Sequence, residues 1–279
     1  MKIAVLSGKG GTGKTLMAVN LASAALTSVY VDCDVEEPNG HLFFKPQQKS
    51  ERTITVKIPY VLTNLCDGSR RCVDFCRFHA LAYVNNKLMV FEDICHSCGG
   101  CSLVCPNHAI KEKDKAIGII SRGLSENVEV LSGFLNPGEV SGMPIIKGLL
   151  DEARQIDKLT IIDCPPGSAC PVMESIRDAD FCLLVAEPTI FGTHNLNMVH
   201  ELVNVFNKPF AVILNKCGNG ENPAKTYCLE RNIPIIAEIP YDQQIADISS
   251  NGHILVRENN TYHKLFSTIL FDVQARLKS

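Results

Sequence analysis

The sequence predicts an α/β protein with a doubly wound, mostly parallel sheet and a small inserted α+β module. Short, continuously apolar runs, typical of buried parallel strands, alternate with helical stretches. A glycine-rich loop joins the first of these strands to the first helix. Seven of the thirteen cysteines lie between Cys66 and Cys105, in a block that such a sheet does not need. We therefore expect residues 1–55 and 119–279 to form the main domain and residues 56–118 to form the insert.

Composition narrows the classes of function. The 279 residues are 46% hydrophobic and 20% charged, which suits one or two globular domains. A formal net charge of −3 gives no electrostatic footprint for nucleic acid, and the longest apolar runs are too short to cross a bilayer. We expect a cytoplasmic protein that neither binds nucleic acid nor inserts into membranes. In a reducing compartment, thirteen cysteines indicate metal or redox chemistry rather than structural disulfides.

The first predicted strand, KIAVLSG, runs into the loop GKGGTGKT and then into the helical stretch LMAVNLASAAL. The loop matches the phosphate-binding pattern G-x-x-x-x-G-K-[ST] in its required context of strand, loop and helix. Its glycines let backbone N–H groups approach phosphate oxygens, Lys14 neutralises the β- and γ-phosphates, and Thr15 offers a hydroxyl to Mg²⁺. We therefore expect ATP and Mg²⁺ as ligands. The predicted binding residues of this loop are Gly8, Lys9, Gly10, Gly11, Thr12, Gly13, Lys14 and Thr15.

A second lysine, Lys9, directly follows the first glycine of the loop. In this respect the loop resembles the deviant Walker A motif of the MinD, ParA and Mrp group of P-loop ATPases. The resemblance implies that Lys9 reaches the phosphates of the partner subunit in an ATP-bound homodimer. It also implies an ATPase that hydrolyses ATP, with Lys9 and Lys14 as catalytic residues.

Two further stretches end in carboxylates where ligands of open α/β sheets gather. SVYVDCDVEEPN delivers Asp32 and Asp34 to the end of a strand and resembles the second motif of the same ATPases. The resemblance implies that Asp34 positions the attacking water, Asp32 is a carboxylate on the metal side and Asn39 contacts the nucleotide. LTIIDCPPGS resembles their Walker B and switch II segment. The implied roles are Mg²⁺ binding through water for Asp163, with Thr15 as the other magnesium residue, and proximity to the γ-phosphate for Gly167.

The remaining segments complete the predicted sheet. FCLLVAEPT and FAVILNKC have the pattern of fully buried strands, with the helical stretch HNLNMVHELVNVF between them, and IPIIAEIPYD supplies one more short strand. In the resembling family, the segment equivalent to NK and the loop after the last strand frame the adenine. This likeness implies a base site at Asn215 and at the turn from Pro240 to Asp242.

The last predicted helix carries an apolar stripe that raises the question of membrane binding. Its members, at helical spacing, are Leu265, Phe266, Ile269, Leu270, Val273 and Leu277. Only scattered basic residues accompany the stripe, whereas a membrane-surface helix is typically rich in them. We expect this helix to pack on its own sheet.

The cysteine block contains a run with the spacing of an iron-sulfur protein. Cys95, Cys98, Cys101 and Cys105, with Pro106, form C-x₂-C-x₂-C-x₃-C-P, the bacterial ferredoxin pattern. Zinc is the main rival, because C-x₂-C pairs also suit tetrahedral sites. Four cysteines at this short spacing with a trailing proline favour iron-sulfur.

The first half of the block repeats the same frame. Cys66, Ser69, Cys72 and Cys76 follow the same spacing, with Ser69 at the second cysteine position. In two-cluster ferredoxins the fourth cysteine of each run ligates the other cluster. The first cluster, a [4Fe-4S] cluster, is then predicted on Cys76, Cys95, Cys98 and Cys101. The second keeps only Cys66, Cys72 and Cys105, and three outcomes are open there: a [3Fe-4S] cluster, a labile [4Fe-4S] cluster, or none.

Taken together, the whole chain resembles the MinD superfamily ATPases that carry an inserted ferredoxin domain. The resemblance implies an ATP-driven switch coupled to an iron-sulfur module, serving metallocluster assembly or ATP-gated electron transfer to an unidentified redox or metallocluster partner protein. The alternative is a ParA- or MinD-type ATPase that positions a partner and whose clusters are structural. Tetrapyrrole amidation, as in related synthetases, is disfavoured because no glutaminase segment follows Lys278. The C-x₂-C pair that Mrp-type carriers use is also missing, since Cys217 and Cys228 are too far apart.

Overall fold

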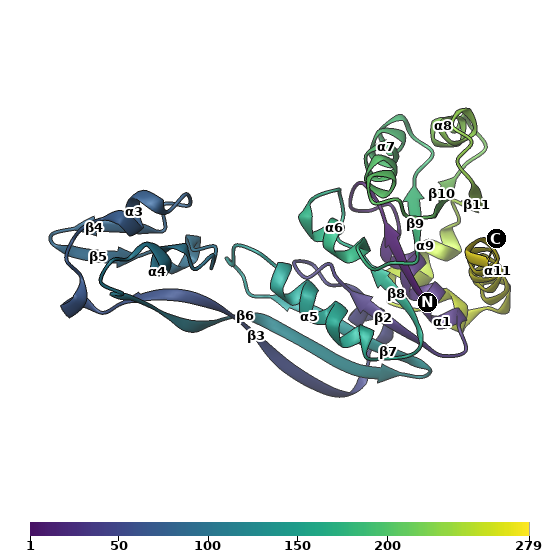
Figure 1. Ribbon diagram of the computed structural model, residues 1–279. Coiled ribbons are helices and arrows are strands. Elements are labelled where there is room, and N and C mark those ends of the chain that lie inside the picture. Colours follow the sequence, from purple (N-terminus) through teal and green to yellow (C-terminus); the bar gives the residue numbers. More distant parts are fainter. Residues whose placement is uncertain (279) are drawn as a thin grey trace.

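The computed structural model describes residues 1–278 and has one large sheet with helices on both faces (Figure 1). Within these residues nine strands form this sheet in the order β11-β10-β9-β1-β8-β2-β7-β6-β3. Every neighbouring pair from β11 to β7 is parallel, and β6 is antiparallel to both β7 and β3. The predicted doubly wound, mostly parallel sheet is therefore confirmed. The strand bounds are β1 (Lys2–Leu6), β2 (Ser28–Asp32), β3 (Gln47–Val61), β6 (Ile110–Ser125), β7 (Val128–Leu135), β8 (Leu159–Asp163), β9 (Phe181–Ala186), β10 (Phe210–Cys217) and β11 (Ile235–Pro240).

Two apolar cores cover the two faces of the sheet, because neighbouring residues of a strand point to opposite sides. Ile3 of β1 belongs to the core with α1, α2, α9, α10 and α11, and its neighbour Ala4 belongs to the core with α5, α6, α7 and α8. Phe266 and Val273 of α11 are fully buried in the first core, so this helix packs on its own sheet as expected. No helix within residues 1–278 is long and apolar enough to cross a membrane. The helix bounds are α1 (Lys14–Ala24), α2 (Gly40–Phe44), α5 (Met143–Arg154), α6 (Cys170–Ile176), α7 (Ile190–Val205), α8 (Pro223–Glu230), α9 (Gln243–Ser250), α10 (Leu255–Glu258) and α11 (Asn260–Lys278).

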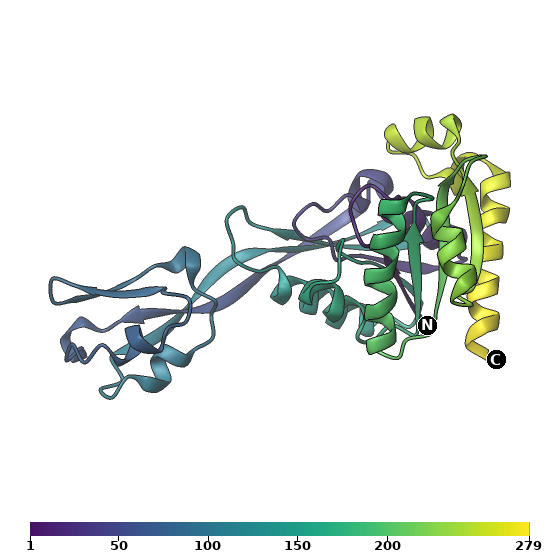
Figure 2. The same cartoon turned by 90° about the horizontal axis from the view of Figure 1, so that it is seen from above.

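The strands β3 and β6 form a long ribbon that reaches beyond the rest of the sheet (Figures 1 and 2). Their pairing runs from Gln47 opposite Leu124 to Val61 opposite Ile110. β7 pairs with β6 only between Gly118 and Ser125, so the ribbon continues alone past Gly118. At its far end it carries residues 62–109, well away from the helices of the main domain (Figure 2). The predicted boundaries of the insert lie where the ribbon leaves the sheet, and the division into two domains stays a prediction.

Residues 62–109, which we call the cysteine module, repeat their own backbone pattern. The amide of Leu62 donates to the carbonyl of Ala109 (2.7 Å), and the amide of Phe91 donates to that of Ala80 (2.8 Å). Positions 62 and 91, like 80 and 109, differ by 29, the separation between the two cysteine runs. The sequence repeat is therefore also a structural repeat. The module contains η1 (Thr63–Leu65), α3 (Arg71–Phe75), β4 (Leu81–Val84), β5 (Lys87–Val90), η2 (Glu92–Ile94) and α4 (Gly100–Val104).

Candidate functional site

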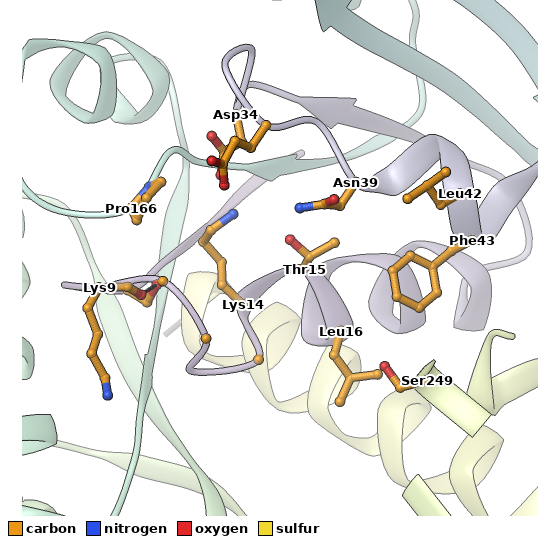
Figure 3. A pocket seen from close by; sticks show the side chains of 15 residues that line it. Lys9, Lys14, Thr15, Leu16, Asp34, Asn39, Leu42, Phe43, Pro166 and Ser249 are labelled. Carbon is orange, nitrogen blue, oxygen red and sulfur yellow. Dashed lines mark hydrogen bonds between the residues drawn. The ribbon is translucent and has the colours of Figure 1, made fainter. Parts of the chain in front are cut away.

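The phosphate-binding loop lies between β1 and α1 and borders a cavity of about 470 Å³. Lys14 and Thr15 line it from the start of α1, Asp34 and Asn39 from the segment after β2, and Pro166 from the loop after β8 (Figure 3). These elements meet because β1 lies beside β8, and β8 lies beside β2. The carboxyl ends of these parallel strands therefore bring the predicted nucleotide residues together.

Two glycines of the loop are required by close backbone approaches. A Cβ on Gly8 would lie 2.2 Å from the carbonyl oxygen of Asn195, and one on Gly13 would lie 2.2 Å from Asn215 Nδ2. Gly13 also has a φ of 92°, which disfavours other residues. The Oγ1 atom of Thr12 is buried without a hydrogen-bond partner in the described structure. A buried hydroxyl left unpaired beside a glycine-rich loop fits a site for phosphate oxygens.

Lys14 is bound to an acidic residue on the neighbouring strand. Its Nζ atom donates to Oδ1 of Asp163, and the Tyr30 hydroxyl donates to Oδ2 of the same carboxylate at 2.9 Å. Burial opposes the charge of Lys14, but the nearby carboxylates, Asp163 above all and then Asp32 and Asp34, outweigh it and raise the pKa of Lys14. A phosphate group that binds Lys14 must therefore compete with Asp163 for this ammonium.

The two carboxylates after β2 occupy different environments. Asp32 is fully buried and accepts hydrogen bonds from the amides of Gly40 (2.9 Å) and Asp34 (3.2 Å), and it does not line the cavity. Burial first, and then the charge of Asp163, raises the pKa of Asp32 to about 7. Asp34 lines the cavity, and burial raises its pKa to about 6 although Lys14 opposes this shift. Asp34 is thus the carboxylate of the pair that faces the space beside Lys14 (Figure 3).

Lys9 belongs to the residues that line the cavity, but its side chain leads out of it. Figure 3 shows its side chain extending out of the space between Lys14, Thr15 and Asp34. Its Nζ atom forms an ion pair with Oε2 of Glu187 at 2.8 Å. Gly167 donates its amide to the carbonyl of Ser7 (2.9 Å), at the start of the same loop.

The residues predicted to frame the base lie together at a second cavity. A hollow of about 300 Å³ adjoins the loop and is lined by Asn215, Pro240 and Asp242. Asn215 Nδ2 donates to the carbonyl of Thr12 at 2.8 Å, which ties the end of β10 to the phosphate-binding loop. Ser249 of α9 lines both this cavity and the one beside Lys14, so the two spaces adjoin each other.

The cysteine module brings together both predicted sets of cysteines. One cavity of about 220 Å³ is lined by Cys76, Cys95, Cys98 and Cys101, with apolar side chains around them. A second hollow of only about 10 Å³ is lined by Cys66, Ser69, Cys72 and Cys105. No group of three or more His, Cys, Asp or Glu within residues 1–278 is arranged to hold a single metal ion. The first set therefore surrounds an open space, whereas the second set is nearly closed.

Two of the cysteine sulfurs in the module accept backbone hydrogen bonds. The amide of Ala80 donates to Cys76 Sγ and the amide of Ala109 donates to Cys105 Sγ, both at 3.3 Å. Burial, with smaller contributions from Cys95 and Cys98, raises the pKa of Cys101 to about 11. This thiol therefore carries a proton at neutral pH, and binding of a metal would release it.

Comparison with known proteins identifies the family. The sequence matches the CobQ/CobB/MinD/ParA nucleotide-binding domain over residues 3–256. The chain belongs to the CobQ/CobB/MinD/ParA family. Two uncharacterized proteins of Methanocaldococcus jannaschii are 30% and 29% identical to it over 266 residues, which span 93% of this chain and 91% and 93% of theirs. A protein named ferredoxin 7Fe from Hydrogenibacillus schlegelii is 33% identical over 57 residues, 20% of this chain and 73% of its own.

Solved structures of this family have the same fold. The cell division ATPase MinD of Pyrococcus furiosus superposes with a TM-score of 0.58 and 18% identity, covering 98% of both chains. The septum site-determining protein MinD of Pyrococcus horikoshii, a complex with Mg-ADP, has the same TM-score and identity and covers 98% of this chain and 95% of its own. The predicted MinD/ParA-type fold and family are therefore confirmed.

Two residues that bind the charged side chains of the site, Glu187 and Tyr30, are not predicted from the sequence. Glu187, which pairs with Lys9, follows the carboxyl end of β9 and could have been found by the rule that pointed to Asp32 and Asp163. Tyr30 gave no such signal, because an aromatic residue inside an apolar strand usually indicates core packing.

Proposed function

We propose that the chain is a MinD/ParA-type ATPase that binds Mg-ATP beside its phosphate-binding loop and dimerises with ATP bound. The observation that carries the proposal is that this loop, with Lys14, and Asp34 line one cavity, while the buried Asp163 binds the Lys14 ammonium directly behind it. This function corresponds to the alternative in the sequence analysis, a ParA- or MinD-type ATPase. The family match and the MinD structures support it better than they support a switch coupled to iron-sulfur chemistry. The Mg-ADP in the MinD complex supports a magnesium nucleotide as the ligand.

Each residue contributes through its position. Without nucleotide, Asp163 provides the negative charge that pairs with Lys14. When nucleotide binds, Lys14 leaves Asp163 and pairs with the phosphate oxygens instead. Asp163, no longer paired with Lys14, and the Thr15 hydroxyl are the residues that would hold Mg²⁺. Asp34 orients the attacking water from the edge of the cavity, and a pKa of about 6 keeps most of its carboxylate ionised at neutral pH. Asn215 and the turn after Pro240 hold the base in the adjoining cavity.

The hydrolysis part of this proposal is tested with two variants. Asp34→Ala should retain ATP binding and lose turnover, because only the orientation of the water is removed. Lys14→Ala should lose ATP binding itself. Binding is measured by titration calorimetry and turnover by phosphate release. An Asp34→Ala variant that hydrolyses ATP at the wild-type rate would contradict the assignment of Asp34.

We further propose that the cysteine module holds iron-sulfur clusters. The four thiols at the 220 Å³ cavity match the set predicted for a [4Fe-4S] cluster, and a polynuclear cluster holds its ligands farther apart than a single ion does. The N–H groups on Cys76 and Cys105 Sγ suit ligating thiolates. The ferredoxin relative is named for seven irons, the count of one four-iron and one three-iron cluster. Because Ser69 replaces one of its four cysteines, the second site is expected to hold a [3Fe-4S] cluster or a labile [4Fe-4S] cluster.

The cluster assignment is tested by anaerobic iron analysis and electron paramagnetic resonance. Cys98→Ala should remove the complete cluster, whereas Cys170→Ala, which changes another exposed cysteine outside the module, should retain it. Ser69→Cys should add a second stable four-iron signal, and Ser69→Ala should leave the wild-type signals unchanged. A single cluster in both the wild type and Ser69→Cys would contradict the second site.

A second candidate function couples the module to the ATPase, in metallocluster assembly or ATP-gated electron transfer to a partner protein. The observation that favours it is that Lys115 of the ribbon contacts both the cysteine module and the main domain. Lys115 Nζ lies 3.0 Å from Glu139 Oε2 and 3.4 Å from the carbonyl of Glu92, three residues before Cys95. The loop of Glu139 follows β7, whose Leu135 amide donates to the carbonyl of Val35, next to Asp34. Cluster potentials that change with ATP would support this function.

A further inference from the structure

Glu187 holds the second lysine of the phosphate-binding loop away from the nucleotide cavity. Oε2 of Glu187 lies 2.8 Å from Lys9 Nζ, and the Glu187 side chain is only 12% exposed. The same ammonium lies 5.3 Å from the centre of the Phe191 ring, in the range of a cation–π contact. Lys9 is thus bound on two sides in the described structure, and neither Glu187 nor Phe191 lines the cavity beside Lys14.

A second lysine orients Glu187. Lys216 Nζ lies 2.7 Å from Oε1 of Glu187 and also donates to the carbonyl of Gly11 at 2.7 Å. Each oxygen of the Glu187 carboxylate therefore has its own cation. Burial alone would raise the pKa of Glu187, but the hydrogen bonds from Lys216 and Lys9 outweigh it and lower the pKa. The carboxylate remains ionised throughout the neutral range.

The backbone around Glu187 is also held in place. The carbonyl of Glu187 accepts from the amide of Thr189 at 2.8 Å, and the Thr189 side chain caps α7 by accepting from the amide of Gly192. A Cβ on Gly192 would lie 2.3 Å from the Glu187 carbonyl oxygen, so the start of α7 packs directly against this residue. The acceptor for Lys9 is therefore fixed between β9 and α7 rather than carried by a free loop.

The backbone of Lys9 is linked through Ser7 to Gly167, which is predicted to lie near the γ-phosphate. Ser7 Oγ donates to the carbonyl of Lys9 at 2.8 Å, and the Ser7 carbonyl accepts from the amide of Gly167 at 2.9 Å. A shift of the Gly167 loop on nucleotide binding would therefore act on the backbone of Lys9.

We propose that Glu187 is a positioning residue that retains Lys9 on its own subunit until the phosphates of a nucleotide bound to a second copy of the chain displace it. This inference rests on the proposed ATP-dependent dimer and adds the residue that opposes it. Forming one dimer breaks two Lys9–Glu187 pairs. Glu187→Gln weakens both pairs, so dimers should form about tenfold more tightly, as expected for two partly exposed ion pairs.

The experiment measures the dimer dissociation constant by sedimentation velocity with a non-hydrolysable ATP analogue. Glu187→Gln should lower it about tenfold, and Glu187→Ala, which offers no acceptor to Lys9, should lower it at least as far. The matched control is Glu238→Gln, which weakens an exposed pair with Lys225 and should leave the constant unchanged. Thermal unfolding verifies that each variant is folded.

Because Glu187 is proposed to act only through Lys9, Glu187→Gln is also tested in the Lys9→Ala variant. There it should have no effect on the dimer dissociation constant. A wild type that dimerises with the analogue while Glu187→Gln leaves its constant unchanged would overturn the role of Glu187 and leave the proposed function intact. An effect of Glu187→Gln that persists in Lys9→Ala would do the same. A wild type and Glu187→Gln that both stay monomeric would overturn the ATP-dependent dimer as well.

Discussion

Replacing Lys14 by Met tests the charge balance at the centre of the nucleotide site without any nucleotide. The Lys14–Asp163 pair is almost fully buried, with side chains 7% and 1% exposed. Lys14→Met leaves Asp163 with the Tyr30 hydroxyl but without a counter-charge. Removing one partner of a buried pair costs about 3–5 kcal/mol, because the remaining charge is uncompensated. The free energy of unfolding should fall by this amount.

The assay is urea unfolding followed by circular dichroism. The double variant Lys14→Met/Asp163→Asn should recover most of the lost stability, since residue 163 then no longer carries a buried charge without a partner. Lys57→Met is the control. It disrupts a pair with Asp114 whose side chains are both 58% exposed, and it should cost at most about 1 kcal/mol. Both Lys14 variants should fail to bind ATP.

Two results would refute this reasoning. The first is a Lys14→Met variant that loses less than about 1 kcal/mol, which would mean that water or another group compensates Asp163. The second is a double variant no more stable than the single one, which would mean that Lys14 stabilises the protein through packing rather than charge.

The remaining predictions concern Asp32, Lys115 and Asn215. Burial and Asp163 raise the pKa of Asp32 to about 7, so the folded state holds this proton more tightly than the unfolded state and stability falls as pH rises from about 4 to about 7. Asp32→Asn should therefore gain thermal stability relative to the wild type between about pH 5 and about pH 8; a difference independent of pH would contradict this. Lys115→Met removes the ion pair with Glu139 and should speed amide exchange of residues 92–95 about fivefold by mass spectrometry, whereas unchanged exchange would show that Lys115 does not restrain the module. Asn215→Ala removes the hydrogen bond to the Thr12 carbonyl and should weaken ATP binding about fivefold, as measured by calorimetry. Asn222→Ala is the control, and an equal loss of binding in that variant would show that the effect is not specific to Asn215.

Patterns that are contiguous in the chain allowed correct predictions. The loop GKGGTGKT lies between β1 and α1, where it borders the cavity, because its function depends on backbone geometry that a short segment encodes by itself. The cysteines predicted for each cluster also line one cavity each, because a repeat of 29 residues imposes one local fold twice, but the clusters themselves stay predictions. The apolar runs predicted a parallel sheet, because strands buried on both faces need apolar residues throughout.

Direction and pairing of charged side chains depended on the tertiary structure. Lys9 is eight residues from the chain start, yet its partner Glu187 follows β9, the strand beside β1. Lys14 pairs with Asp163 across a separation of 149 residues because β8 is the other neighbour of β1.

The sequence by itself thus determined the fold class, the family and the position of the glycine-rich loop, which follow from local patterns, whereas the cluster ligand sets stay predictions. The tertiary structure decided which carboxylate holds each lysine, that Asp32 is buried, and that the cysteine module lies at the end of the β3–β6 ribbon. The physical reason is that an ion pair forms with whichever opposite charge the strand order brings near, and strand order is a property of the whole sheet.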